Sequence, residues 1–302
     1  MHISTLLRGC MVASLTAVSS FSFAQKVVTT EKTGQLETLI SEAEREKTPS
    51  LQVVGPINGE DIQVIRTMCG RDYSGYESEG TTRTLDLSEA LIKQEAGKNY
   101  LNEQLGFYNR FYAPSADNEI GIKMFYRCEP LREIILPKTT TVIAGQAFDN
   151  CTSLTKCTFF AGLTTIRQYA FRNTKLAEVE LPSTLTAMEN KVFDGCKELT
   201  TVMFTSKAVP TLPDELFSNC PKLKTVIVPQ ESLEAYKAAL KLPEGVTIEG
   251  RAGIAAVRSA AASAAVVEVA RFDLQGRRLA QPQKGVNIVR YSNGTTAKVV
   301  VR

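Results

Sequence analysis

The chain has 302 residues, with 35 Lys and Arg against 32 Asp and Glu, one His and no Trp. This near balance of charge excludes a general attraction to nucleic acid. The single histidine, His2, lies in a segment that we expect to be removed on export. The mature chain is therefore expected to have no imidazole base, no histidine metal ligand and no histidine-activated nucleophile, and we expect neither a cofactor nor enzymatic activity.

Residues 1–24 are predicted to be a signal peptide. Arg8 provides a positive start, and the largely apolar run 9–23 contains no acid and no lysine. This run is too short to span a bilayer, and residues 22–24 before Gln25 fit the rule for signal cleavage. The mature protein is therefore expected to begin at Gln25 and to be secreted or displayed on the cell surface.

A lipoprotein cleavage before Cys10 is the alternative, because residues 7–10 loosely resemble a lipobox. It is disfavoured since Arg8 does not suit such a motif and the apolar run follows Cys10 instead of preceding it. No later stretch approaches the roughly 18 consecutive apolar residues of a membrane span, so no transmembrane segment is expected.

Residues 25–130 are predicted to form an N-terminal cap followed by atypical repeats. The amphipathic segment Leu36 to Ala43 is interpreted as a cap, and Leu51 to Val54 with the helix-like Asp61 to Met68 as an opening coil. A further strand is expected at Leu85-x-Leu87. Such atypical ends are typical of repeat proteins, which must shield their last core layer.

An insertion near residues 95–117 concentrates aromatic side chains, and these are candidate contacts for a glycan or protein partner: Tyr100, Phe107, Tyr108, Phe111 and Tyr112. The competing interpretation is a helix packed on the flank of the repeats, with Leu101, Leu105, Tyr108 and Tyr112 on one side. We favour the helix, because steps of four, three and four residues fit a helical face, although Gly106 weakens it.

From residue 131 the sequence repeats with a nearly fixed period, in the pattern Leu-x-x-apolar-x-apolar. The leading residues are Leu131, Leu154, Leu176, Leu199 and Leu223, at steps of 23, 22, 23 and 24 residues. One coil cannot bury its apolar side, but stacked coils form a continuous core. The pattern predicts a solenoid over residues 131–250, with a short strand in each coil and a closing helix at Ser232 to Leu240.

A phenylalanine about seventeen residues after each leucine marks a turn or short helix: Phe148, Phe171, Phe193 and Phe217. Two residues later come Asn150, Asn173, Gly195 and Asn219. These residue types tolerate the left-handed backbone conformation that ends a coil at low cost.

These residues resemble the leucine-rich repeats of the BspA-like family of bacterial surface proteins, whose units read Leu-x-x-Ile-x-Leu-Pro and then Ile-x-x-x-Ala-Phe-x-x-Cys. The segment from Leu131 to Cys151 follows that pattern almost position for position. The second repeat departs from it with Phe160 for proline and Thr174 for cysteine. The resemblance implies a leucine-rich repeat solenoid, β-rich within the α/β class, and attachment to host matrix proteins or other bacteria.

The outward strand positions of successive coils are the candidate binding face, because stacked coils present side chains at regular spacing. They are Glu133, Ile135, Lys156, Thr158, Glu178, Glu180, Thr201, Met203, Thr225 and Ile227. An ordinary solvated face with scattered apolar residues is an equal alternative.

Four cysteines share the Phe-x-x-Cys position: Cys128, Cys151, Cys196 and Cys220. Equivalent positions in stacked coils point in parallel at near strand spacing, which favours a buried row of thiols over disulfide bonds or a metal site. Cys69 and Cys157 are expected in the core.

The remaining residues differ in composition. Residues 251–266 are rich in Ala and Ser and are interpreted as a linker, and residues 267–302 as a small all-β module with turns at Gln275-Gly276 and Asn293-Gly294. This module resembles the C-terminal sorting domain of type IX secretion substrates, which implies export across an outer membrane and attachment to surface glycolipid. A β-module that merely ends the chain is the alternative.

Three functions follow as hypotheses. The first is a non-catalytic adhesion or binding protein that contacts an extracellular protein or glycan through the repeat face. The second is a glycan-binding or glycan-hydrolysing protein that uses the aromatic insertion, although hydrolysis requires two carboxylates about 5–9.5 Å apart across a cleft. The third is a structural spacer.

Overall fold

The computed structural model describes residues 25–105, 108–253, 268–273, 276–279, 281, 283–291 and 296–301. The predicted signal peptide, Phe107 and the greater part of the predicted linker lie outside these residues, as do Gln275 and the Asn293-Gly294 turn. Within the described residues the helices are all short, and none has the length and apolar character needed to cross a bilayer.

The N-terminal unit combines strands with helices. The strands are β1 (Lys26–Thr29), β2 (Ser50–Ile57) and β3 (Thr84–Ile92), and the helices are α1 (Leu36–Leu39), α2 (Glu42–Lys47) and α3 (Gly59–Met68). The three strands pair in parallel in this order, and β3 also pairs in parallel with the first strand of the repeats, Glu133–Ile135. Leu51 to Val54 lie in β2, and the expected helical character of Asp61 to Met68 is confirmed by α3.

The segment Leu36 to Ala43, expected to be an amphipathic cap, does not form one continuous helix, and local capping explains why. Ile40 is extended, and Ser41 begins α2 with a capping box to Glu44. The α3 helix is capped in the same way by Asn58 and Asp61. The buried Asp61 carboxylate also accepts hydrogen bonds from the Gly34 and Leu36 amides, at 2.6 and 2.8 Å, so it holds the loop before α1 against α3.

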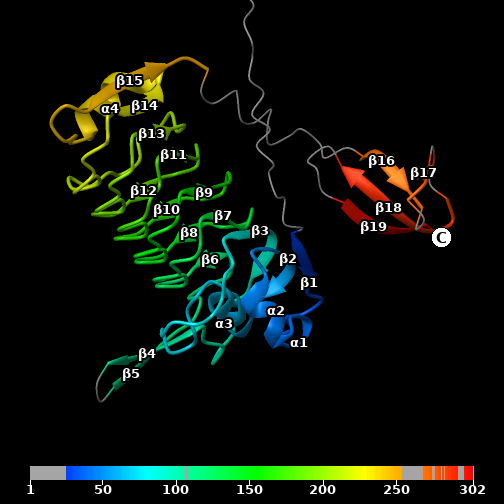
Figure 1. Cartoon of the computed structure of the whole chain (residues 1–302). Helices are drawn as coiled ribbons and strands as arrows, with labels where there is room; N and C mark the ends of the chain where they lie inside the picture. The colour runs from blue at the N-terminus through cyan, green and yellow to red at the C-terminus, as the bar shows by residue number, and fades with distance from the viewer. Residues whose placement is uncertain are drawn as a thin grey trace, which may run out of the picture.

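The aromatic insertion forms a β-hairpin, so the predicted helix is wrong. Strands β4 (Leu101–Leu105) and β5 (Tyr108–Tyr112) pair antiparallel, with Leu101 opposite Tyr112 and Leu105 opposite Tyr108. The four residues that would share a helical face therefore share one face of the hairpin. Aromatic residues favour strands over helices, and the hairpin satisfies the backbone of both segments. The hairpin protrudes from the N-terminal end of the stack (Figure 1).

The repeats form a solenoid whose coils carry strands on two sides. On one side lie β7 (Glu133–Ile135), β9 (Lys156–Thr158), β11 (Glu178–Leu181), β13 (Thr201–Phe204), β14 (Thr225–Pro229) and β15 (Thr247–Arg251). On the other lie β6 (Glu119–Ile120), β8 (Val142–Ile143), β10 (Thr165–Ile166) and β12 (Ala187–Met188). Strands of successive coils pair in parallel on both sides, except that β9 and β11 do not pair with each other (Figure 1).

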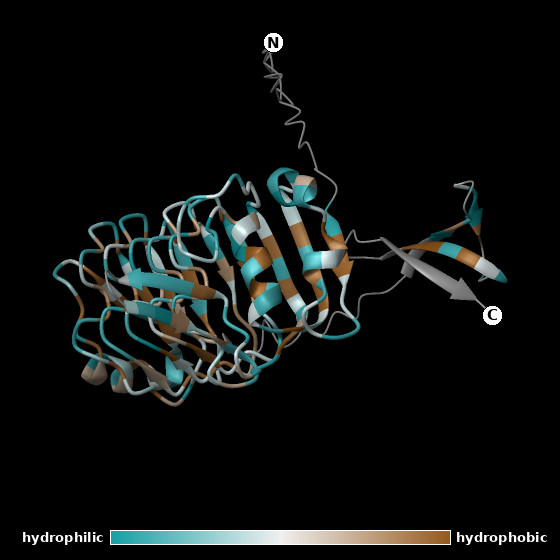
Figure 2. Ribbon diagram, turned by 90° about the horizontal axis from the view of Figure 1, so that it is seen from below, coloured by the Kyte–Doolittle hydropathy of each residue, from teal (hydrophilic) through white to brown (hydrophobic). Residues whose placement is uncertain are grey.

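A row of stacked phenylalanines runs through the core. Phe125, Phe148, Phe171, Phe193 and Phe217 lie 5.2–6.0 Å apart between successive ring centroids and are nearly parallel. Hydrophobic residues lie inside the stack, while the peripheral loops are mostly hydrophilic (Figure 2). The predicted left-handed positions are confirmed, since the backbone φ is 60° at Asn150, 57° at Asn173, 70° at Gly195 and 55° at Asn219.

The solenoid ends at a short helical segment, and a separate sheet follows in the sequence. The 3₁₀ turn η1 (Gln230–Ser232) and helix α4 (Leu233–Ala239) confirm the predicted closing helix, and β15 pairs with β14. Strands β16 (Glu268–Phe272), β17 (Arg278–Leu279), β18 (Gly285–Tyr291) and β19 (Thr296–Val301) form an antiparallel sheet in the order β17-β16-β18-β19.

Candidate functional site

The row of outward strands is interrupted between the second and third coils. Strand β9 is the last strand of one parallel sheet, and β11 is the first strand of the next. Within the described residues no backbone hydrogen bond joins these two strands, whereas β7 pairs with β9 and β11 pairs with β13. The coils remain joined on their other sides, where β10 pairs with β12 and the Phe171 amide donates to the Val192 carbonyl.

The cause of this interruption is one missing residue. Two residues separate Cys151 from Leu154, and the same spacing precedes Leu131, Leu199 and Leu223, but only Lys175 separates Thr174 from Leu176. The longer spacing allows a turn in which the leucine amide donates to the cysteine carbonyl, for example from Leu154 to Cys151 at 2.9 Å. The Thr174 to Leu176 segment is too short for that turn.

The hydrogen bonds of the following strand change as a result. In the regular coils two successive amides converge on one carbonyl of the previous coil, as Thr200 and Thr201 do on Ala177 at 2.8 and 3.3 Å. Between the second and third coils a single amide, that of Lys175, donates to Leu154 at 2.9 Å. The coils thus stay in contact at that point and separate along β9 and β11.

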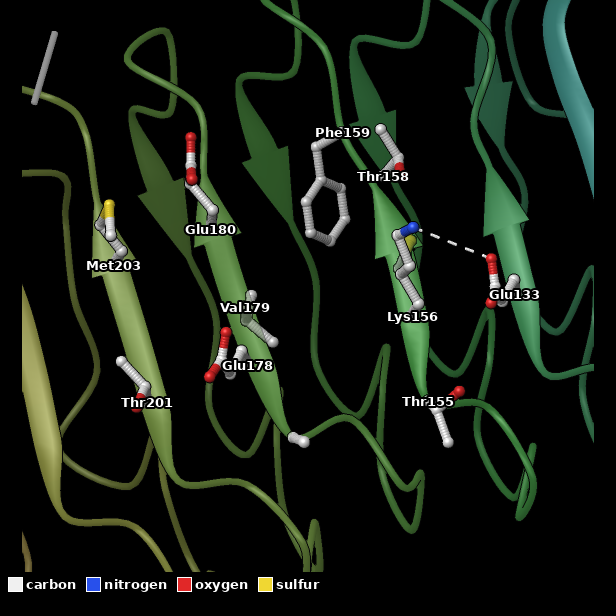
Figure 3. Close-up of a pocket in the computed structure, with 12 residues that line it drawn as sticks. Glu133, Thr155, Lys156, Thr158, Phe159, Glu178, Val179, Glu180, Thr201 and Met203 are labelled. Atoms are coloured by element: carbon white, nitrogen blue, oxygen red, sulfur yellow. Dashed lines mark ion pairs between the residues drawn. The ribbon is translucent and has the colours of Figure 1, made fainter. Parts of the chain in front are cut away.

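A groove with a volume of about 470 Å³ lies at this interruption. Its floor includes Cys157 and Phe159, whose inward strand positions are fully buried in the regular coils but half-buried here. The Phe159 ring stands between the β9 and β11 ribbons (Figure 3) and packs edge-on against Phe171, with ring centroids 5.8 Å apart. The volume is in the range of about 300–1,000 Å³ that is typical of ligand sites.

The rim of the groove is mainly acidic. Glu133, Glu178 and Glu180 line it together with one cation, Lys156. The Lys156 Nζ atom lies 3.8 Å from Glu133 Oε2 on the neighbouring strand, while Glu178 and Glu180 stand along β11 on the other side of Phe159 (Figure 3). Removal from water raises the pKa of the Cys157 thiol well above its usual value, so this thiol is protonated at neutral pH and is a weak nucleophile.

Most residues of the predicted binding face line the groove. Glu133, Lys156, Thr158, Glu178, Glu180, Thr201 and Met203 all line it. Ile135 on β7 and Thr225 on β14 lie outside the groove, and both are half-buried. The expectation that Ile227 faces solvent is wrong, because its side chain is only 5% exposed and lies between Met203 and Glu249 of the adjacent strands.

The aromatic hairpin residues divide into anchors and exposed rings. Tyr100 is buried and its hydroxyl donates to the Ile122 carbonyl at 2.7 Å. Tyr112 is also buried, and its hydroxyl donates to Glu103, which binds the Lys123 ammonium at 2.7 Å. Burial and the Glu103 carboxylate raise the pKa of Tyr112 to about 12. Two predicted contacts, Tyr108 and Phe111, are exposed, by 78% and 55%.

The cysteines of the Phe-x-x-Cys positions form the predicted buried row. Cys151, Cys196 and Cys220 donate through sulfur to the carbonyls of Phe125, Phe171 and Phe193 in the preceding coils, at 2.9, 3.1 and 3.0 Å. All six described cysteines are free. Within the described residues no cluster of three or more His, Cys, Asp or Glu side chains could hold a metal ion.

Sequence reasoning did not predict the groove. The signal was present in the 22-residue step from Leu154 to Leu176, which is the shortest of the four. It coincides with two departures from the repeat pattern, Phe160 and Thr174. The Thr174 hydroxyl donates to the Phe171 carbonyl of its own coil, whereas the cysteines at this position bond to the coil before.

Part of the chain is similar to a known family of repeats. Residues 118–241 match the family model described as a BspA type leucine rich repeat region, in six copies. The chain matches no curated protein.

Several solved structures resemble the chain. A leucine-rich repeat protein of T. pallidum has 25% identity and a TM-score of 0.35, covering 57% of this chain and 75% of that one. A leucine-rich repeat protein of Bacteroides ovatus has 18% identity and a TM-score of 0.37, covering 68% and 51%. The pneumococcal vaccine antigen PcpA has 12% identity and a TM-score of 0.40, covering 68% of each. The chain thus spans about half the length of the Bacteroides protein.

Proposed function

We propose that this chain, whose residues 118–241 are a BspA-type leucine-rich repeat region, is a non-catalytic binding protein that holds an extracellular partner on the outward face of β7, β9, β11 and β13. The observation that carries this proposal is the groove between β9 and β11. It combines a half-buried apolar floor with a charged rim, as ligand sites commonly do. Adhesion to host or bacterial proteins is the form of binding that we propose.

The composition of the groove supports binding over catalysis. Its one thiol, Cys157, has a raised pKa and is weakly nucleophilic. Its carboxylates are accompanied by Lys156 and threonines, and the chain has no histidine besides His2 to act as a base.

A glycan-binding function of the hairpin is the second candidate, favoured by the exposure of Tyr108 and Phe111. Alternate residues of a strand point to opposite faces, so these two rings, three residues apart on β5, lie on opposite sides of the hairpin. They therefore cannot form one flat stacking platform, and we place the principal site in the groove.

An array of purified matrix proteins, bacterial surface proteins and glycans tests this proposal. The mature chain should bind a protein saturably, the double variant Glu178→Lys/Glu180→Lys should lose that binding, and Tyr108→Ala/Phe111→Ala should retain it. Glycan binding that is lost only in the hairpin variant would transfer the function to the hairpin. A chain that binds nothing on the array would support the spacer hypothesis instead.

We further propose that the protein is exported by residues 1–24 and reaches the cell surface through its C-terminal module as a type IX sorting domain. The antiparallel sheet β16–β19 and the nine Lys and Arg from Arg251 onward support this role, because basic charge favours contact with anionic glycolipid. Deletion of residues 267–302 in the native host should leave the protein in the periplasm. Surface display that is undiminished by the deletion would contradict it.

A further inference from the structure

We infer that the groove between β9 and β11 binds an extended peptide with an apolar side chain flanked by basic residues. This inference rests on the proposed binding function and names the class of ligand. It follows from the floor of the groove, from its rim and from the two strand edges that face each other across it.

The floor requires an apolar side chain. In the regular coils the positions of Cys157 and Phe159 are occupied by fully buried residues, such as Val202 and Phe204. In the second coil the separation of β9 from β11 leaves both side chains half-buried beside Val179. A side chain inserted here would remove Cys157 and Phe159 from water and complete the packing above Phe171, which is favourable for apolar atoms.

The rim requires a cation on either side of that apolar group. Three carboxylates and one ammonium, that of Lys156, line the groove, so the lining carries excess negative charge. Two of the carboxylates, those of Glu178 and Glu180, lie on β11. These two residues point to the same side of the strand, as alternate positions do (Figure 3). Basic residues on both sides of the anchor would approach the carboxylates, whereas an anionic ligand would be repelled.

The strand edges favour an extended main chain. The edges of β9 and β11 that face each other lack a strand partner across the groove within the described part of the chain. Main-chain groups on such edges form hydrogen bonds with an added strand in many peptide complexes. A peptide also supplies both the apolar anchor and the flanking charges from consecutive residues, which a glycan does not.

Fluorescence anisotropy with labelled peptides tests this inference directly. The probe is Gly-Ala-Lys-Phe-Lys-Ala-Gly, and the matched peptides replace both lysines with glutamate or the phenylalanine with alanine. We expect the mature chain to bind the probe at least about ten-fold more tightly than either matched peptide, and we expect added salt to weaken that binding. Equal binding of the glutamate peptide would overturn the inference.

Two variants of the protein complete the test. Glu178→Lys/Glu180→Lys should lose the probe and prefer the glutamate peptide, whereas Glu244→Lys/Glu249→Lys, an equal change of charge outside the groove lining, should bind the probe as the native chain does. Insertion of one serine between Thr174 and Lys175 restores the regular spacing, and it should abolish binding by closing the groove. Undiminished probe binding in either groove variant would overturn the inference.

The outcome also separates this inference from the proposed function. If the mature chain captures a protein on the array through the groove but does not bind the probe, the ligand class is wrong while the binding function stands. If it captures a glycan through the groove, the peptide is likewise the wrong class.

Discussion

The junction between the second and third coils and the junction between the third and fourth coils differ by one residue and have opposite consequences. At the junction between the third and fourth coils, Cys196 to Leu199 form a turn and β11 pairs with β13 over four residues. At the junction between the second and third coils, the segment Thr174 to Leu176 is one residue shorter, and β9 and β11 do not pair with each other. The core below is continuous in both places, since Phe171 stacks on Phe148 and on Phe193. A repeat protein can therefore open its surface at one coil without breaking its core.

Truncation of equivalent phenylalanines should give the largest difference between these regions. Phe204 and Phe159 occupy the same strand position, but Phe204 is fully buried against Tyr236 and Phe159 is half-buried. Phe204→Ala should lower the free energy of unfolding by about 3–5 kcal/mol. Phe159→Ala should cost roughly half as much, because part of its ring is already exposed to water.

Chemical denaturation of the two variants measures this difference. A loss at Phe159 equal to that at Phe204 would show that the second coil is as well packed as the fourth, and it would remove the basis for a groove.

Shortening the junction between the first and second coils by one residue should separate the strands there as well. Deletion of Ser153 shortens the spacing between Cys151 and Leu154 and should remove the turn and the paired amide contacts to Arg132. Three hydrogen bonds at about 0.5–1.5 kcal/mol each predict a loss of roughly 2–4 kcal/mol. The serine insertion after Thr174 should raise the free energy of unfolding. The gain should be smaller than that loss, because ordering the added residue costs about 1–2 kcal/mol.

The denaturation midpoints of the deletion and insertion variants show whether each one stabilises or destabilises the chain. If the insertion destabilised the chain as much as the deletion, spacing would not be the cause of the interruption.

Much of the fold could be predicted because it depends on periodic burial. The leucine positions, the phenylalanine row and the left-handed asparagines all lie where a stacked coil requires them. The hairpin could not be told from a helix by the same reasoning. Leu101, Leu105, Tyr108 and Tyr112 lie on one face in either structure, so the pattern of their spacing is ambiguous and aromatic strand preference decides.

The groove escaped prediction because it depends on chain length between repeats, not on residue type. The inward strand positions of the second coil, including Cys157 and Phe159, are apolar, so the pattern of burial along the strand gives no sign that the coil is open. The omitted residue before Leu176 changes hydrogen bonding of the backbone, which side-chain periodicity does not report.

The difference in labelling rate between individual cysteines should be the smallest of these effects, but it reports on the groove alone. Burial raises the pKa of Cys196 to about 11 and of Cys220 to about 12, and it raises that of Cys157 as well. Their thiolate fractions are therefore small at pH 8 and increase as the pH rises. In the native protein Cys157, which is half-buried in the groove, should react with iodoacetamide several-fold faster than the fully enclosed Cys151 and Cys196.

Mass spectrometry of the alkylated peptides identifies the reacting thiol. Preferential labelling of Cys151 over Cys157 would contradict the placement of the opening.

Hydrogen exchange of the β9 and β11 amides tests the central claim most directly. Without ligand, residues 156–158 and 178–181 should exchange faster than the paired residues 201–204 and 225–228, because one edge of each strand has no partner. Adding the Lys-Phe-Lys peptide should slow exchange in both β9 and β11. Full protection of these strands in the free protein, unchanged by the peptide, would contradict an open binding groove.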